Sequence, residues 1–223
     1  LRTPLTSIRG ALGLILQPFA GTLAQAGCEL VDIATENCDR LISLINDILD
    51  IDKITSGDMR LDIAVHDVAD LIDQAVRTNR AYAERFGVML RRGPVSEDLC
   101  IRVDDSRLVQ ILSNFLSNAV KFSSDDGVVE ISAAKIDGRV RIGVADHGPG
   151  IPVEFRERVF SRFAQADSST ARAKNGSGLG LHISRQLAEA IAGSVGFETE
   201  TGAGSTFWVE FETVQVPAKA QAG

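Results

Sequence analysis

A change of apolar rhythm at Thr55–Asp58 constrains this fold more than any other feature of the sequence. The residues before it carry apolar side chains at helical spacing: Leu30, Ile33, Ala34, Leu41, Leu44, Ile45, Ile48 and Ile51. The steps through Ala34, Leu41 and Ile48 are heptads, which are typical of a helical bundle or coiled-coil seam. Beyond the break, alternating runs mix with amphipathic patterns. The expected divisions are residues 1–57, residues 58–213 and a disordered tail over residues 214–223.

The first division is predicted to be a helical hairpin. A second apolar stripe precedes the heptads: Leu5, Ile8, Leu12, Ile15 and Leu16. Pro18, Gly21 and Gly27 interrupt the pattern between the two stripes. Because two helices cannot cover both stripes, we expect pairing with a second copy into a dimeric four-helix bundle. The alternative is a hairpin that packs on the second division of its own chain.

The second division is predicted to be an α+β sandwich, with helices on one face of a mostly antiparallel sheet. The helical patterns cover Val68–Phe86, Leu108–Phe122 and Leu179–Ile191. The strand patterns cover Met59–Val65, Val88–Arg91, Leu99–Val103, Val128–Lys135, Arg139–Ala145, Ser194–Glu200 and Ser205–Phe211. Asp137-Gly138 is a favoured pair for a two-residue hairpin turn.

Composition narrows the classes of function. The 223 residues are 44% hydrophobic, enough for one sizeable core or two modest ones. A net charge of -7 argues against a nucleic-acid partner. No run reaches the roughly 18–20 apolar residues that span a bilayer, so we expect no direct membrane insertion by this chain. Its three cysteines, Cys28, Cys38 and Cys100, lack metal-ligand spacing and fit a reduced, cytoplasmic protein.

The first polar cluster is NFLSNAVKF, in a predicted helix. Asn114 and Asn118 share one helix face, and Lys121 follows a turn later. Two amides and an ammonium group suit phosphate oxygens with a hydrated divalent cation, and Mg²⁺ keeps several waters and takes few protein ligands. The same pair of amides also occurs in ordinary capping or surface chemistry.

The second cluster is DHGPGIP, directly after a predicted strand. Asp146 could accept a hydrogen bond from an exocyclic amine such as that of adenine. Gly148 and Gly150 allow a sharp turn and a close approach of the backbone to a flat ligand. Taken alone, this pattern also describes an ordinary turn.

The third cluster is NGSGLGL, which opens a predicted helix. Gly176, Gly178 and Gly180 free backbone amides to face an anion at the positive end of that helix. The pattern is neither a Walker loop nor a Rossmann fingerprint. Taken alone, it could equally be a flexible loop.

In this order, the three clusters resemble the ATP-binding domain of bacterial sensor histidine kinases, within the gyrase, Hsp90, kinase and MutL superfamily. Residues 1–57 resemble the dimerisation and phosphotransfer hairpin of these kinases. The resemblance implies a catalytic core that binds ATP and Mg²⁺ and passes the γ-phosphoryl group to a histidine. From there the phosphoryl group passes to an aspartate on a response-regulator receiver domain. It also implies a homodimer through residues 1–57.

The resemblance assigns roles around the phosphates. Asn118 matches the magnesium ligand, and Asn114 and Lys121 match its polar neighbours. Gln165 matches a lid residue that reaches the γ-phosphate or the metal. The second glycine box of the family corresponds to Gly176, Gly178 and Gly180.

Other roles concern the base. Asp146 matches the carboxylate that reads adenine, and Gly148 and Gly150 shape the pocket. Thr206 resembles the hydroxyl that backs the adenine site. The phenylalanine box corresponds to Phe160 and Phe163, which are expected to anchor the lid.

Position 114 separates the subclasses of the superfamily. Hydrolysing members carry a glutamate there that activates water, whereas an amide is a poor general base. Asn114 therefore favours a kinase over a conformational ATPase. A conformational ATPase and a non-catalytic dimerising scaffold are the alternatives.

The opening LRTPLTSIRG matches the end of a longer motif. In the family, the phosphorylated histidine stands in His-Glu-Leu-Arg-Thr-Pro-Leu, so Leu1 occupies the third position. We expect the acceptor histidine and its glutamate to precede Leu1, which makes this chain a truncated piece of a parent kinase that is cytoplasmic or membrane-anchored. Thr3 matches the residue that positions water for a phosphatase reaction. The histidines in the chain, His66, His147 and His182, do not lie on the hairpin.

Overall fold

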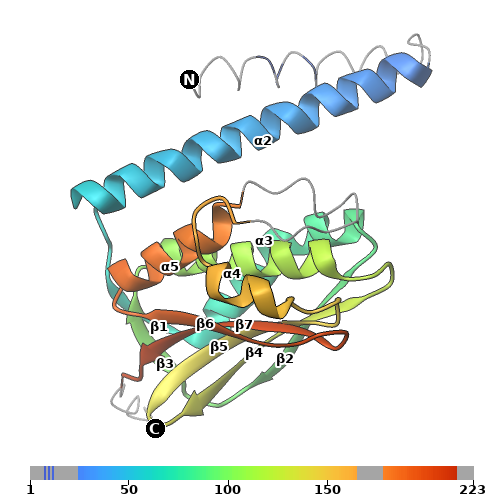
Figure 1. Cartoon of the computed structure of the whole chain (residues 1–223). Coiled ribbons are helices and arrows are strands. Elements are labelled where there is room, and N and C mark those ends of the chain that lie inside the picture. The colour runs from blue at the N-terminus through green and yellow to red at the C-terminus, as the bar shows by residue number, and fades with distance from the viewer. Residues whose placement is uncertain (1–7, 9, 11, 13–24, 165–177, 215–223) are drawn as a thin grey trace, which may run out of the picture. The chain divides into compact units, whose positions relative to one another are not determined.

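The computed structural model of the chain (Figure 1) describes residues 8, 10, 12, 25–164 and 178–214. The chain divides into two compact units, residues 1–58 and residues 59–223. This division falls one residue beyond the expected boundary. Apart from Val214, the expected tail lies outside the described residues.

The first unit contains the long helix α2, Gln25–Ser56. Gly57 ends it with a φ of +77°, a left-handed conformation that glycine adopts readily, and its N–H donates to the carbonyl of Ile54. The heptad residues Leu41 and Ile48 are 46% and 56% exposed in the single chain. Most of the expected first helix lies outside the described residues, and residues 8, 10 and 12 of it are helical.

The second unit is built on a five-stranded sheet in the order β2-β4-β5-β7-β6. Its strands, in that order, are Met89–Val95, Val128–Ile136, Arg139–Asp146, Gly204–Glu212 and Ser194–Glu200. β2 runs parallel to β4, and the other pairs are antiparallel. Asp137 and Gly138 both have positive φ, as the predicted two-residue turn requires.

Three helices cover one face of this sheet (Figure 1). They are α3, α4 and α5, which span Val68–Arg85, Asp105–Phe122 and Gly180–Ala190. A short 3-10 helix, η1, covers Val153–Arg158. The predicted α+β fold, with helices on one face of a mostly antiparallel sheet, is confirmed.

The core lies between the helices and this face. Val140, Ile142 and Val144 alternate along β5 and are buried, and Phe115 of α4 is fully buried as well. Because side chains on a strand alternate between the two faces, the same parity brings Asp146 to the helix-covered face at the end of β5. The core pattern therefore positions the first candidate site residue.

A second sheet corrects one prediction. β1, Ala64–Asp67, pairs with β3, Cys100–Val103, in an antiparallel two-stranded sheet apart from the five-stranded one. A strand was expected from Met59, but residues 58–63 belong to no strand or helix. One backbone N–H of this connector, that of Asp62, donates to Asp104 Oδ2 at 2.8 Å, where a ladder partner would otherwise be required.

Candidate functional site

The helix α4 presents Asn114, Asn118 and Lys121 on one half-buried face. Asn114 Nδ2 donates to the carbonyl of Gly180 at 3.1 Å and to Ser184 Oγ at 3.2 Å. Both acceptors lie on the first turn and a half of α5. Asn114 therefore joins α4 to the start of the glycine-rich helix.

Asp146 at the end of β5 is only 7% exposed. Its Oδ1 accepts a hydrogen bond from the backbone N–H of Gly148 at 2.8 Å, and its carboxyl group also accepts from the backbone N–H of Ser205. Burial raises the pKa of Asp146, and these two hydrogen bonds together with the nearby His147 offset only part of that effect. A desolvated carboxylate of this kind is a strong acceptor for a ligand N–H group.

The loop after β5 is held against the turn between β6 and β7. The N–H of Ile151 donates to Thr199 Oγ1 at 2.9 Å, and the N–H of Gly202 donates to the carbonyl of Pro149 at 2.8 Å. At Gly150, where φ is +73°, a Cβ atom would collide with the carbonyl of Glu200. The loop therefore needs glycine at this position.

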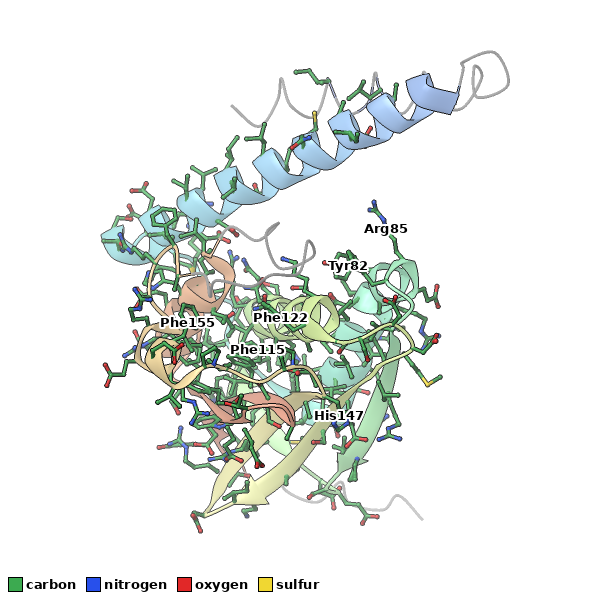
Figure 2. All side chains as sticks on the ribbon, turned by 45° about the vertical axis from the view of Figure 1, so that its right-hand side comes forward. Tyr82, Arg85, Phe115, Phe122, His147 and Phe155 are labelled. Carbon is green, nitrogen blue, oxygen red and sulfur yellow. The ribbon has the colours of Figure 1, made fainter. Side chains whose placement is uncertain are left out.

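Gly148 is the second position at which this loop closely approaches another part of the backbone. A Cβ atom there would collide with the carbonyl oxygen of Phe122. Phe122 is the last residue of α4. Figure 2 labels Phe122 and also His147, the residue that precedes Gly148. The Asp146 loop and the C-terminal end of α4 thus meet at a glycine.

The expected position of Thr206 in the site is corrected to Ser205. Ser205 pairs with Asp146 in the β5–β7 ladder, whereas Thr206 pairs with Ala145 and its side chain faces the other side of the sheet. Ser205 is buried, and its Oγ lies 2.9 Å from Thr199 Oγ1. The signal was present in the sequence, because Ser205 has the same parity as the apolar residues Phe207, Val209 and Phe211.

The glycine cluster opens α5. Gly178 has a φ of +69°, and a Cβ atom there would lie 2.8 Å from the carbonyl carbon of Phe163. Gly180 is the first residue of the helix, within contact distance of the Asn114 side chain. The other expected residues, Thr3, Gln165 and Gly176, lie outside the described residues.

The two expected phenylalanine anchors differ in the structure. The ring of Phe160 packs against those of Phe197 and Phe207, with centroid distances of 6.0 and 6.3 Å. Phe163 is 68% exposed, because its backbone, at a φ of +59°, packs on Gly178 and its ring faces solvent. Phe160 therefore packs into the core, whereas the ring of Phe163 does not.

The fit to a metal ion follows from the donor set. The described residues contain no group of three histidine, cysteine, aspartate or glutamate side chains that could hold a metal. Asn114 and Asn118 offer amide oxygens on one half-buried face, and a divalent cation there would take water and ligand oxygens as its other ligands, which suits Mg²⁺. Within the same described residues, no helix is both long and apolar enough to cross a membrane.

Two family profiles match the chain. The profile described as "Histidine kinase-, DNA gyrase B-, and HSP90-like ATPase" matches residues 103–215, just over half of the chain. The profile described as "His Kinase A (phospho-acceptor) domain" matches residues 1–57.

Among curated proteins, the circadian input-output histidine kinase CikA of Synechococcus elongatus is 34% identical over 223 residues, covering 98% of this chain. The histidine protein kinase DivJ of Caulobacter vibrioides is 34% identical over 220 residues, covering 99% of this chain. The chain spans only 30% and 37% of the lengths of these two relatives.

Among solved structures, full-length ShkA in complex with AMPPNP is 35% identical, with a TM-score of 0.77 over 97% of this chain and 44% of that chain. The histidine kinase ThkA in complex with the response regulator protein TrrA is 22% identical, with a TM-score of 0.68 over 95% of this chain and 59% of that chain. The latter likeness shows a shared fold.

Proposed function

We propose, from the premise that this chain belongs to the histidine kinase-, DNA gyrase B- and HSP90-like ATPase family, that it is the catalytic core of a two-component sensor histidine kinase. The second unit would bind ATP with Mg²⁺. The first unit, which matches the phospho-acceptor profile, would form a homodimer. The AMPPNP complex of ShkA supports ATP as the ligand.

The adenine base is assigned to the end of β5. The buried carboxylate of Asp146 would accept a hydrogen bond from the exocyclic amine, and Ser205 would support that carboxylate through its backbone N–H. The close approaches at Gly148 and Gly150 hold the loop that follows Asp146 against the backbones of Phe122 and Glu200, and larger residues there would displace that loop. These features support a purine nucleotide as the ligand.

The phosphates are assigned to the space between α4 and the start of α5. Asn118 would hold Mg²⁺ through its side-chain oxygen, and Lys121 would pair with phosphate oxygens. The backbone amides around Gly178 and Gly180 would face the same anion at a helix N-terminus. A bound magnesium ion would offset the charge of the transferring phosphoryl group. We also assign Gly176 and Gln165 to this site, from the resemblance alone.

The side chain of Asn114 is the observation that favours a kinase over an ATPase. Its Nδ2 is committed to Gly180 and Ser184, and an amide oxygen is too weak a base to deprotonate water. The site would therefore hold ATP until a separate nucleophile arrives. Transfer would then rest on positioning and charge neutralisation.

The proposed nucleophile is a histidine two positions ahead of Leu1 in the family motif. Its phosphoryl group would pass to an aspartate of a response-regulator receiver domain docked on the first unit, and Thr3 would position water in a phosphatase reaction. We assign the chain to the cytoplasm, which the free thiols of Cys38 and Cys100 support.

The experiment is transfer of labelled γ-phosphate from ATP to three proteins: this chain, the chain extended by His-Glu before Leu1, and the chain extended by Gln-Glu. We expect acid-labile label only on the His-Glu protein, at an ATP affinity that all three share. Steady phosphate release without label would instead support a conformational ATPase. Absence of ATP binding would support a scaffold.

A further inference from the structure

His182, in the first turn of α5, makes two contacts with the segment that follows η1. Its Nδ1 lies 3.1 Å from the carbonyl oxygen of Phe160. Its Nε2 lies 3.1 Å from Nε of Arg162. Both ring nitrogens are therefore engaged by one short stretch of chain.

These contacts determine the protonation state of the ring. A guanidinium N–H can only donate, so Nε2 must be the acceptor and carry no proton. The proton must then lie on Nδ1, from which it is donated to the carbonyl of Phe160. A doubly protonated ring would lose the bond to Arg162 and set two cations against each other.

The contacts lie where the chain enters and leaves residues 165–177. A Cβ atom at Gly178 would lie 2.8 Å from the carbonyl carbon of Phe163 and 3.0 Å from the carbonyl oxygen of Ala164. The backbones on the two sides of this stretch thus touch. We call these two segments, residues 160–164 and 178–182, the neck.

The neck is attached to the core and to α4. On one side, the ring of Phe160 packs on Phe197 and Phe207 of the core. On the other, the carbonyl of Gly180 accepts the hydrogen bond from Asn114. A change in the spacing of the neck would therefore move the amides of Gly178 and Gly180 relative to α4.

We propose that His182 is a positioning residue that holds the two segments of the neck together as the Nδ1–H imidazole, and that loss of its two contacts weakens nucleotide binding. The charged group that faces the ring from the neighbouring segment is Arg162. On α5 itself, Arg185 pairs with Glu189. The effect on affinity rests on the proposed ATP-binding function, whereas the state of the ring does not.

Three substitutions separate the two contacts. His182→Gln can place an amide oxygen near Nε2 and keep the bond from Arg162. His182→Asn can place an amide N–H near Nδ1 and keep the bond to Phe160. His182→Ala removes both. His66→Gln on β1 is the matched control for loss of a histidine.

ATP affinity is measured at pH 7.5. We expect His182→Ala to bind about three- to tenfold more weakly than wild type, because it loses both contacts, with His182→Gln and His182→Asn between them. His66→Gln should bind ATP as the wild type does.

A second measurement reads the ring directly. The ¹⁵N shifts of His182 at pH 7.5 should show a protonated Nδ1 and an unprotonated Nε2, and Arg162→Met should remove the preference for this tautomer. Arg185→Gln is the matched control for loss of a nearby positive charge.

The outcomes separate the two proposals. Equal ATP affinities of the wild type and His182→Ala at pH 7.5, or a proton on Nε2 at that pH, would overturn the role of His182. If the wild type fails to bind ATP at all, the proposed function fails, and the ¹⁵N shifts still decide the state of the ring.

Discussion

At the scale of single residues, Asp146 meets two opposed requirements. Its burial raises its pKa and disfavours the charged form, while the proposed adenine contact needs a strong acceptor. Hydrogen bonds from the backbones of Gly148 and Ser205 offset part of the cost. This residue therefore lowers stability in exchange for binding, as functional sites often do.

Asp146→Asn should raise the free energy of unfolding near neutral pH and weaken ATP binding by about 10- to 100-fold, the range for a hydrogen bond to a charged group. Because the folded-state pKa of Asp146 is raised, its unfavourable contribution appears as the pH rises through that pKa and is absent below the usual value near 4. The stability gain should therefore shrink toward acid pH. Thermal melts from pH 4 to 7.5 and calorimetric titration with ATP measure both effects. A loss of stability at pH 7.5 would contradict the argument.

Gly148→Ala should lower the free energy of unfolding by about 1–3 kcal/mol, the usual range for overpacking. The new methyl group would collide with the carbonyl of Phe122. It should also weaken ATP binding by moving the Asp146 loop. Gly143→Ala is the matched control, since its Cβ would lie 3.5 Å from Thr206 Cγ2, an ordinary contact. Urea unfolding and ATP titration of both variants test this, and equal behaviour of the two would refute it.

At the scale of elements, the start of α4 is hydrogen-bonded to the chain segment that precedes β1. Asp104, only 4% exposed, caps the helix through the backbone N–H of Arg107 and the hydroxyl of Ser106, and it also binds the backbone of Asp62. The connector that leads out of the first unit is thus tied to the helix that carries Asn114 and Asn118. An unpaired connector is not visible in the alternating pattern of Met59–Val65, which is why a strand was predicted there.

Asp104→Ala should lower the free energy of unfolding by about 1–3 kcal/mol at pH 7, from loss of the helix cap and of the bond to Asp62. Burial alone would raise the pKa of Asp104, but the hydrogen bonds from Ser106, Asp62 and Arg107, together with the charge of Arg107, outweigh it and lower the pKa.

The stabilisation from Asp104 is therefore present above its usual pKa near 4 and is lost as the pH falls through the lowered value. Urea unfolding at pH 7 and pH 3 should show a smaller difference between wild type and Asp104→Ala at pH 3. Asp105→Ala, which changes the neighbouring acid, should have a small effect at both pH values. A constant difference for Asp104→Ala would exclude a role for its charge.

At the scale of the whole molecule, the two units differ in how far each one buries its own apolar side chains. The second unit buries a contiguous core of its own, including Phe115, Ile142 and Leu187. In the first unit, Ile33, Leu41, Ile48 and Leu49 stay exposed in the single chain. An apolar stripe of this kind on a long helix is typical of a surface that a second copy covers.

Ile48→Glu should therefore convert a dimer into a monomer, since burial of one isoleucine contributes about 1.5–3 kcal/mol per chain. ATP affinity should change little, because the nucleotide residues lie on the second unit. Thr55→Glu, at an exposed position of the same helix, is the matched control for the added charge. Sedimentation velocity and ATP titration measure the two properties. A wild-type chain that sediments as a monomer would refute the dimer.

The sequence by itself determined the three polar clusters and, apart from the strand expected from Met59, the main helices and strands of the second unit, because these signals are local. Period and turn residues identify a helix or a strand, and the glycines of DHGPGIP and NGSGLGL mark the loops that must approach closely. β6 was predicted over the residues that it occupies, Ser194–Glu200.

Only the tertiary structure decided which side chains meet. The pairing of Ser205 with Asp146, the exposure of Phe163 and the two contacts of His182 depend on ladder register and on contacts between distant segments. A shift of one residue along a strand moves a side chain to the other face. This is why the structure places Ser205, and not the predicted Thr206, beside Asp146. The face on which Ser205 lies follows from its parity with Phe207, Val209 and Phe211, but the identity of its partner on β5 and the contacts of Phe163 and His182 leave no periodic signal in a single sequence.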